Sequence, residues 1–178
     1  MEVFNISLCY NLTVETKGKR EPEEALYEPI REFLHSKFSA RFGDCHLEIT
    51  ASGRFEETLK KAVRHDIIFA FLGKKASPDL AGFTQDESGI KDFITVEIKP
   101  GKITLQDIYQ AKLYGDLFSA KYALLISPQP VPEEIRRLQQ NLFILYRFMS
   151  GWYVYIGQWQ DELSNEVIEN SWFPESPF

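Results

Sequence analysis

Apolar positions recur along the chain with two different periods, one typical of helices and one typical of strands. In residues 21–38 they return every three or four positions, which predicts an amphipathic helix although Pro29 lies inside it. Further helices are predicted at 54–65, 103–120 and 131–140, the last of which begins with proline and acidic residues, as first turns favour. Each of these helices has an apolar side that must pack against another element.

Short apolar or alternating runs between these helices predict strands. These runs comprise residues 45–52, 66–73, 78–83, 92–99 and 121–127. Near the C-terminus, the aromatic-rich runs 141–148 and 151–159 predict a β-hairpin that turns at 149–151. The order of the elements predicts a single α/β domain over residues 1–178, in which a mixed sheet is flanked by helices.

Composition narrows the class of protein. The chain has 178 residues, of which 44% are hydrophobic and 26% are charged, and this is a normal globular profile. No apolar run approaches the length that crosses a bilayer, so we expect no membrane partner. The N-terminus has no basic leader, and Cys9 and Cys45 lie far apart and outside any CxxC pair. We therefore expect a cytoplasmic protein with reduced thiols rather than a zinc or iron–sulphur protein.

The net charge of −6 is unfavourable for a protein that contacts phosphate groups, but the charge is unevenly distributed. Basic residues gather in one stretch, here called the basic cluster. They are Lys60, Lys61, Arg64, Lys74 and Lys75. The basic cluster predicts a local nucleic-acid contact, although an ordinary solvated surface would have the same composition.

Two acidic residues stand at symmetric positions around a predicted turn. If the strands on either side of this turn pair as an antiparallel hairpin centred on Ser88, Asp79 lies directly opposite Glu97. Opposed residues point to the same face of a sheet, with Cβ atoms about 5 Å apart. Lys99 follows Glu97 by two positions and therefore points to that face as well. The spacing predicts two carboxylates and one ammonium group at one end of the sheet.

Carboxylates at this distance repel each other unless a cation lies between them. Mg²⁺ and Mn²⁺ are cations that carboxylate oxygens bind well, and the backbone carbonyl of Ile98 can add a ligand. Lys99 can orient or deprotonate an attacking water, or stabilise charge on the phosphate. We therefore predict metal-assisted hydrolysis of a phosphodiester bond, with Asp79, Glu97 and Lys99 as catalytic residues. The simpler alternative is a plain ion pair between Glu97 and Lys99.

Two sequence motifs resemble a known family. Residues 77–83 (SPDLAGF) and 96–99 (VEIK) resemble the signature of the PD-(D/E)XK nuclease superfamily, and 110–114 (QAKLY) resembles the QxxxY motif of its RecB-type branch. The resemblance implies a restriction-endonuclease-like core of three layers and metal-dependent nuclease activity. It also implies that Gln110 holds the site water or the phosphate, and that Tyr114 packs nearby beside the nucleic acid. The iron–sulphur members of this branch have four cysteines, so the resemblance does not extend to them.

In that branch a glutamate of the first helix often completes the metal site, and this chain offers Glu23, Glu24 and Glu28. On a helical wheel Glu23 lies within about 20° of both Ile30 and Leu34, on the apolar side of the helix. We therefore expect Glu23 to be the metal ligand. The alternative is a first-turn glutamate that only interacts with the helix dipole.

Asp66 also precedes an apolar run, so it resembles the aspartate position of the same motif. The centre of a hairpin that paired Asp66 with Glu97 would fall next to Ala81, within an apolar run rather than in a turn. Asp79 is therefore preferred to Asp66 at this position.

The sequence thus predicts an enzyme, a metal-dependent nuclease that acts on nucleic acid, and on DNA rather than RNA. One alternative is a catalytically inactive nuclease-like module that binds nucleic acid or protein, which the net acidity favours. Another is a phosphoesterase that acts on small molecules such as nucleotides. The aromatic C-terminal hairpin also allows a homodimer, although it can equally extend the sheet of its own domain.

Overall fold

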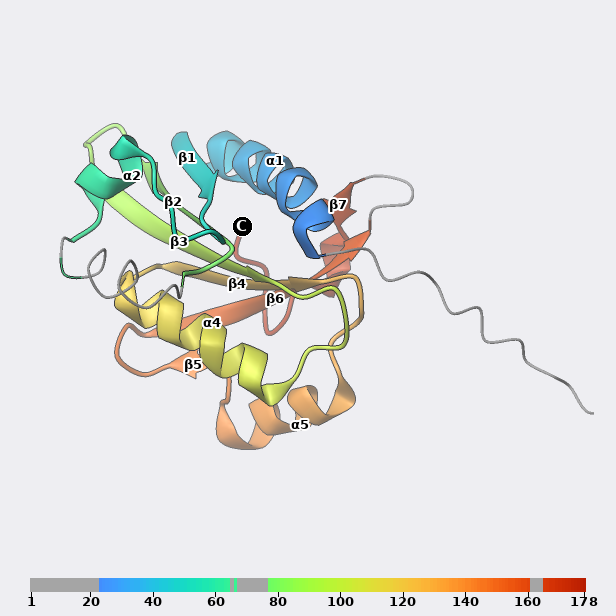
Figure 1. The fold of residues 1–178 in the computed structure, drawn as a ribbon. Helices are drawn as coiled ribbons and strands as arrows, with labels where there is room; N and C mark the ends of the chain where they lie inside the picture. Colours follow the sequence, from blue (N-terminus) through green and yellow to red (C-terminus); the bar gives the residue numbers. More distant parts are fainter. Residues whose placement is uncertain (1–22, 65, 67–76, 161–164) are drawn as a thin grey trace, which may run out of the picture.

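The computed structural model describes residues 23–64, 66, 77–160 and 165–178 of the protein. The helices are α1 (Glu23–Phe42), α2 (Glu57–Ala62), α4 (Leu105–Leu117), α5 (Glu133–Leu142) and the 3-10 helix η1 (Glu169–Ser171). The strands are β1 (Asp44–Ile49), β2 (Leu80–Gln85), β3 (Lys91–Ile98), β4 (Tyr122–Ser127), β5 (Tyr146–Arg147), β6 (Trp152–Gln160) and β7 (Glu166–Val167). Figure 1 shows α1 on one side of the sheet and α4 and α5 on the other.

Within the described residues the sheet has seven strands, in the order β1-β2-β3-β4-β6-β5, with β7 paired to β6 outside this path. β1, β2 and β3 pair antiparallel, whereas β4 runs parallel to β3 and β6 runs parallel to β4. Parallel neighbours need a crossover connection, and α4 and α5 lie in these two crossovers. The prediction of an α/β fold with a mixed sheet flanked by helices is therefore confirmed.

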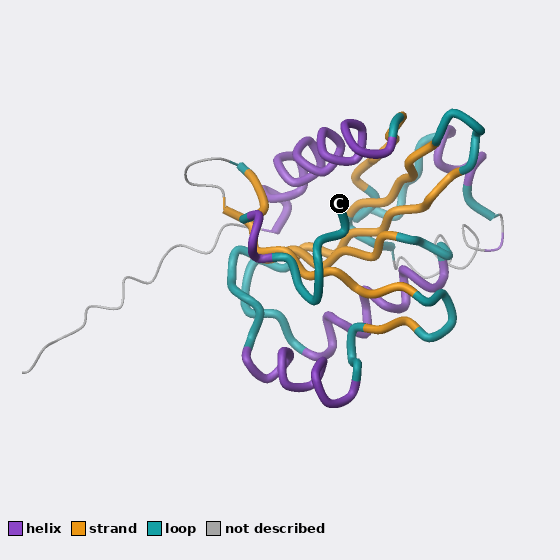
Figure 2. Tube along the Cα trace, turned by 180° about the vertical axis from the view of Figure 1, so that it is seen from behind, coloured by secondary structure: helices purple, strands orange, loops and turns teal. Residues whose placement is uncertain are grey.

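The two faces of the sheet are covered by apolar residues of different helices. Those of α1 recur at helical spacing and are Leu26, Ile30, Leu34 and Phe38. α1 continues through Pro29, and on the opposite face α4 and α5 contribute Ile108 and Ile135. The C-terminus returns to the α1 face, where the rings of Phe178 and Phe38 lie 5.0 Å apart between centroids (Figure 2). The first strands and α1 thus share one core, which fixes α1 against the sheet.

The predicted C-terminal hairpin of two long strands is not confirmed. β5 and β6 pair over two residue pairs, residues 141–142 complete α5, and β6 pairs mainly with β4. The difference has a physical reason in Arg147, which is fully buried. Its guanidinium donates to Asp116 Oδ1 (2.9 Å) and to the carbonyl of Ala120 (2.7 Å). These bonds tie β5 to the end of α4, while β5 itself pairs with β6 over only two residue pairs.

One other predicted element differs from the structure, and another falls on residues that the structure does not describe. The helix predicted at 54–65 is shorter, because Glu56 and Val63 both have extended backbone conformations at the ends of α2. The strand predicted at 66–73 lies outside the described residues, except for Asp66.

Candidate functional site

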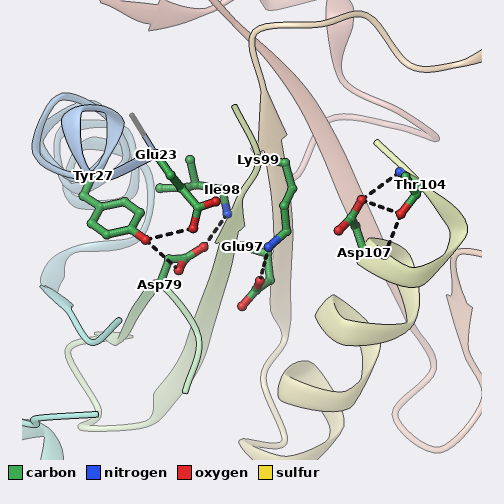
Figure 3. Close-up of polar contacts among 8 residues, drawn as sticks. All are labelled: Glu23, Tyr27, Asp79, Glu97, Ile98, Lys99, Thr104 and Asp107. Atoms are coloured by element: carbon green, nitrogen blue, oxygen red, sulfur yellow. Dashed lines mark hydrogen bonds and ion pairs between the residues drawn. The ribbon is translucent and has the colours of Figure 1, made fainter. Parts of the chain in front are cut away.

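The ladder between β2 and β3 brings the two predicted acids together at one end of the sheet. Its residue pairs have the register predicted around Ser88, and this prediction is therefore confirmed. Continued by one residue, the ladder places Asp79, which precedes β2, opposite Glu97 in β3. Figure 3 shows these two residues, here called the acidic pair, together with Lys99 and with Glu23 of α1.

Asp79 is buried and held at both carboxylate oxygens. Its Oδ1 accepts a hydrogen bond from the Tyr27 phenol (3.1 Å), and its Oδ2 accepts one from the backbone N–H of Ile98 (2.7 Å). α1 and β3 therefore fix the orientation of this side chain. Each carboxylate oxygen has a second lone pair, so Asp79 can still bind a cation. The carbonyl of Ile98 as a metal ligand stays a prediction.

Glu97 is almost completely buried, with 1% of its surface exposed. Its Oε2 lies 3.1 Å from Lys99 Nζ, in an ion pair that is shielded from water. Its Oε1 has no hydrogen-bond partner among the described residues. A buried carboxylate oxygen without a partner destabilises the fold, because the water that solvated it has not been replaced. Oε1 is therefore the atom of this site that most requires a ligand.

Glu23, the first residue of α1, is half-buried and faces the site, whereas Glu24 and Glu28 are exposed. The Tyr27 phenol donates to Glu23 Oε1 at 2.9 Å as well as to Asp79. Burial and the neighbouring carboxylates raise the pKa of Tyr27, so the phenol keeps its proton as a donor. This placement agrees with the helical-wheel argument for Glu23, and its role as a metal ligand stays a prediction.

Burial and like charges raise the pKa values of the acidic pair. The pKa of Glu97 is raised from its ordinary 4.5 to about 8, chiefly by burial and also by the charge of Asp79, while Lys99 opposes the change. Burial also raises the pKa of Asp79, although the N–H of Ile98 and the charge of Lys99 oppose the change. For Lys99, burial lowers the pKa but the attraction of the carboxylates outweighs it, so the pKa is raised. The site therefore favours additional positive charge.

α4 carries the QxxxY residues beside the acidic pair. Its first turn is fixed by Thr104, whose backbone N–H donates to Asp107 Oδ2 at 2.8 Å and whose Oγ1 accepts from the Asp107 N–H at 3.4 Å (Figure 3). Tyr114 is buried, and burial raises its pKa, while a hydrogen bond with Gln110 lowers it and the charge of Glu97 raises it. Tyr114 thus lies within electrostatic range of the acidic pair. The roles predicted for Gln110 and Tyr114 stay predictions.

The described part of the basic cluster is partly neutralised by acids. Lys60 forms an ion pair with Glu57 (2.9 Å), and Arg64 forms one with Asp66 (2.7 Å). Lys61 is exposed on α2. The remaining two members, at positions 74 and 75, lie outside the described residues. Asp66 is an exposed residue on the surface, and the position opposite Glu97 is taken by Asp79.

A second group of potential metal ligands was not predicted from the sequence. The ligand atoms of His46, Glu48 and Glu56 all lie within 4.8 Å of one another. Part of this grouping could have been predicted from the sequence, because His46 and Glu48 are two positions apart in β1 and so point to the same face. Glu56 reaches them after the chain turns back, which no local pattern indicates. In the part of the chain that the structure describes, these three side chains bring their ligand atoms this close together, whereas the acidic pair and Glu23 do not.

The two groups differ in how fully their oxygens are already bonded. Glu48 Oε2 lies 3.0 Å from His46 Nε2, and Glu48 Oε1 accepts the backbone N–H of Glu56 at 2.9 Å. Both oxygens of the buried Glu48 are therefore satisfied, whereas Glu97 Oε1 is not. Lys99 lies beside the acidic pair, whereas none of the three members of the second group is a lysine. We therefore take the acidic pair as the candidate centre.

Comparisons with known proteins leave the function to be inferred from the chain itself. No protein-family model matches the chain, and no curated protein or solved structure matches it either. Among the helices that the structure describes, none has the length and apolar character needed to cross a membrane.

Proposed function

We propose that the protein is a metal-dependent nuclease that hydrolyses phosphodiester bonds of nucleic acid, DNA rather than RNA, in the cytoplasm. One observation carries this proposal. Glu97 presents a buried, unpartnered carboxylate oxygen next to Asp79, and Lys99 is bound to its other oxygen. Two acids and a lysine at adjacent strand ends are the groups that metal-assisted hydrolysis of a phosphodiester needs.

The donor set fits Mg²⁺ or Mn²⁺. Asp79, Glu97 and Glu23 supply carboxylate oxygens, and the carbonyl of Ile98 supplies a neutral one, all of which are hard ligands. The group has no thiolate or imidazole that would favour a softer metal. A bound divalent ion would offset the charge of the carboxylates and polarise the phosphodiester.

The protein's own residues have separate tasks in this proposal. Asp79, fixed at both oxygens, holds its ligand position with little freedom to rotate. The ammonium group of Lys99 holds the attacking water and stabilises negative charge that develops on the phosphate. Gln110, on the neighbouring helix, contacts the phosphate. Tyr114 packs beside it in the core, because a side chain this buried does not reach the nucleic acid as the sequence predicted.

The mixed sheet between helices supports the restriction-endonuclease-like core of three layers that the motif resemblance implies. The residues that carry the motif resemblance lie at the start of β2, at the end of β3 and on α4. A homodimer stays a prediction; Phe148 and Met149, which are 77% and 92% exposed after β5, are the residues through which it would form.

An inactive nuclease-like binding module is the second candidate, and one observation favours it. The net charge is −6, and two of the described basic residues, Lys60 and Arg64, are already paired with acids. Pairing with acids makes these two residues less available for phosphate contacts.

Cleavage assays test the proposal directly. Wild-type protein with Mn²⁺ is expected to cleave single- or double-stranded DNA, and Asp79→Asn and Lys99→Met are each expected to lower the rate by about 100-fold or more. Glu24→Gln is the matched control, because this exposed glutamate of α1 lies outside both the acidic pair and the basic cluster. Equal cleavage by wild type and Asp79→Asn would contradict the proposal. DNA binding without cleavage would support the binding module, and turnover of nucleotides alone would indicate a phosphoesterase for small molecules.

A further inference from the structure

The phenol of Tyr27 lies between two carboxylates that come from different parts of the chain. Its oxygen is 2.9 Å from Glu23 Oε1 and 3.1 Å from Asp79 Oδ1 (Figure 3). A phenol has one proton, so it donates to one of these oxygens at a time. Two negatively charged groups nevertheless share this one neutral partner. The arrangement brings Glu23 next to Asp79.

The position of Glu23 makes such a partner important. Its side chain is half-buried, and the Tyr27 phenol donates a hydrogen bond to its carboxylate. Tyr27 lies one turn further on, on the same side of the helix, and its ring packs against the core under α1. The ring is thus anchored by packing, while its hydroxyl reaches the carboxylate of the less constrained residue.

We propose that Tyr27 is a positioning residue that presents Glu23 to the divalent cation bound by Asp79 and Glu97. This inference rests on the metal site of the proposed function. Without the hydroxyl, the Glu23 side chain would sample other rotamers, and part of the binding free energy of the cation would be lost in ordering it. The phenol itself is not a ligand in this proposal and contacts no reacting atom.

The substitution Tyr27→Phe keeps the packed ring and removes the hydroxyl. We expect it to weaken Mn²⁺ binding, measured by calorimetry on the full chain, by about 10-fold. The Mn²⁺ concentration for half-maximal cleavage should rise by a similar factor, while the rate at saturating Mn²⁺ stays within about twofold of wild type. Tyr153→Phe, in a half-buried tyrosine of β6, is the matched control and should change neither quantity.

A double-mutant cycle separates positioning from a general structural role. If Tyr27 acts through Glu23, Tyr27→Phe should have little further effect on Mn²⁺ affinity in a Glu23→Gln background. Equal weakening in both backgrounds would overturn the inference, as would unchanged or tighter Mn²⁺ binding by Tyr27→Phe alone.

The outcomes also distinguish this inference from the nuclease proposal. If wild-type protein binds Mn²⁺ and the cycle is non-additive but no substrate is cleaved, the nuclease proposal fails and the role of Tyr27 stands. If wild-type protein cleaves DNA and Tyr27→Phe leaves the Mn²⁺ dependence unchanged, the role of Tyr27 fails and the nuclease proposal stands. Absence of Mn²⁺ binding by wild-type protein would overturn both.

Discussion

At the scale of single residues, Glu97 combines burial, a like-charged neighbour and incomplete hydrogen bonding in one side chain. It is 1% exposed, it faces Asp79, and its Oε1 has no partner among the described residues. A residue placed only for packing would not need a carboxylate here, because an apolar or amide side chain of similar size would be more stable. Residues that break a local rule in this way are typical of functional sites, where stability is lower than the fold allows.

The titration of Glu97 should be visible in the stability of the metal-free protein. Its pKa in the folded state, about 8, lies above its ordinary 4.5, so the folded state binds the proton more tightly than the unfolded state does. The free energy of unfolding should therefore fall as the pH rises from about 4.5 to about 8. In EDTA, Glu97→Gln should be more stable than wild type at about pH 8 by roughly 2 kcal/mol, and this difference should shrink toward about pH 5.

Chemical denaturation at both pH values measures this difference. Glu24→Gln, at an exposed position of α1, provides the control and should leave the stability unchanged at either pH. A Glu97→Gln effect of the same size at both pH values would show that ionisation of this residue is not responsible.

At the scale of elements, β1 and β2 approach each other so closely that only a glycine fits at position 82. A Cβ atom added at Gly82 would lie 1.9 Å from the carbonyl oxygen of His46 and 2.8 Å from Leu47 Cα. Both atoms belong to the backbone of β1, so no rotamer change can relieve the clash. Because β2 starts directly after Asp79, the strand that positions the acidic pair depends on this glycine.

Gly82→Ala should therefore destabilise the protein by about 3 kcal/mol or more, because one strand must move away from the other. Gly101→Ala is the matched control: nothing lies within 4 Å of the added Cβ, and stability should change by no more than about 0.5 kcal/mol. Denaturant titrations compare the two variants. If Gly82→Ala proves as stable as Gly101→Ala, the two strands are not packed as closely as described.

Elements whose partners are local in sequence could be predicted, and the others could not. The helices follow from apolar periodicity, and the register of β2 with β3 follows from the turn around Ser88. The pairing of β6 with β4, in contrast, follows from the crossover through α5, which is a property of the tertiary structure. Aromatic alternation alone indicated a strand there but not its neighbour.

At the scale of the whole molecule, the candidate site is assembled from three separate stretches of chain. Asp79 and Glu97 could be paired from spacing, and Glu23 could be chosen from helix periodicity. The contact of Tyr27 with Asp79 joins residues 52 positions apart, and no pattern of either segment indicates it. Spacing in β1 places His46 and Glu48 on one face, but no local pattern indicates that Glu56 joins them.

Thermal unfolding can locate the cation within the folded chain. A ligand at about 100 times its Kd adds about 2.7 kcal/mol to the free energy of unfolding. For a chain of this size, this corresponds to a rise in Tm of about 5–10 °C. Wild-type protein should show this rise with Mn²⁺ and Asp79→Asn should lose it, because the acidic pair is the proposed site.

His46→Ala is the informative control for this measurement, since it removes one member of the second group and leaves the acidic pair intact. It should keep the Mn²⁺-dependent rise in Tm. Loss of the rise in His46→Ala together with its retention in Asp79→Asn would move the cation to the second group.

The hydrogen bonds of Tyr27 to both Glu23 and Asp79 have a consequence for how the protein would lose activity on heating. A cation bound there would link Glu23 of α1 to the ends of β2 and β3, and so would join the helix to the sheet. Loosening of the start of α1 would release the ion while the apolar layers beneath remained closed. Heated protein would then stop working at a temperature where most of its architecture was still intact.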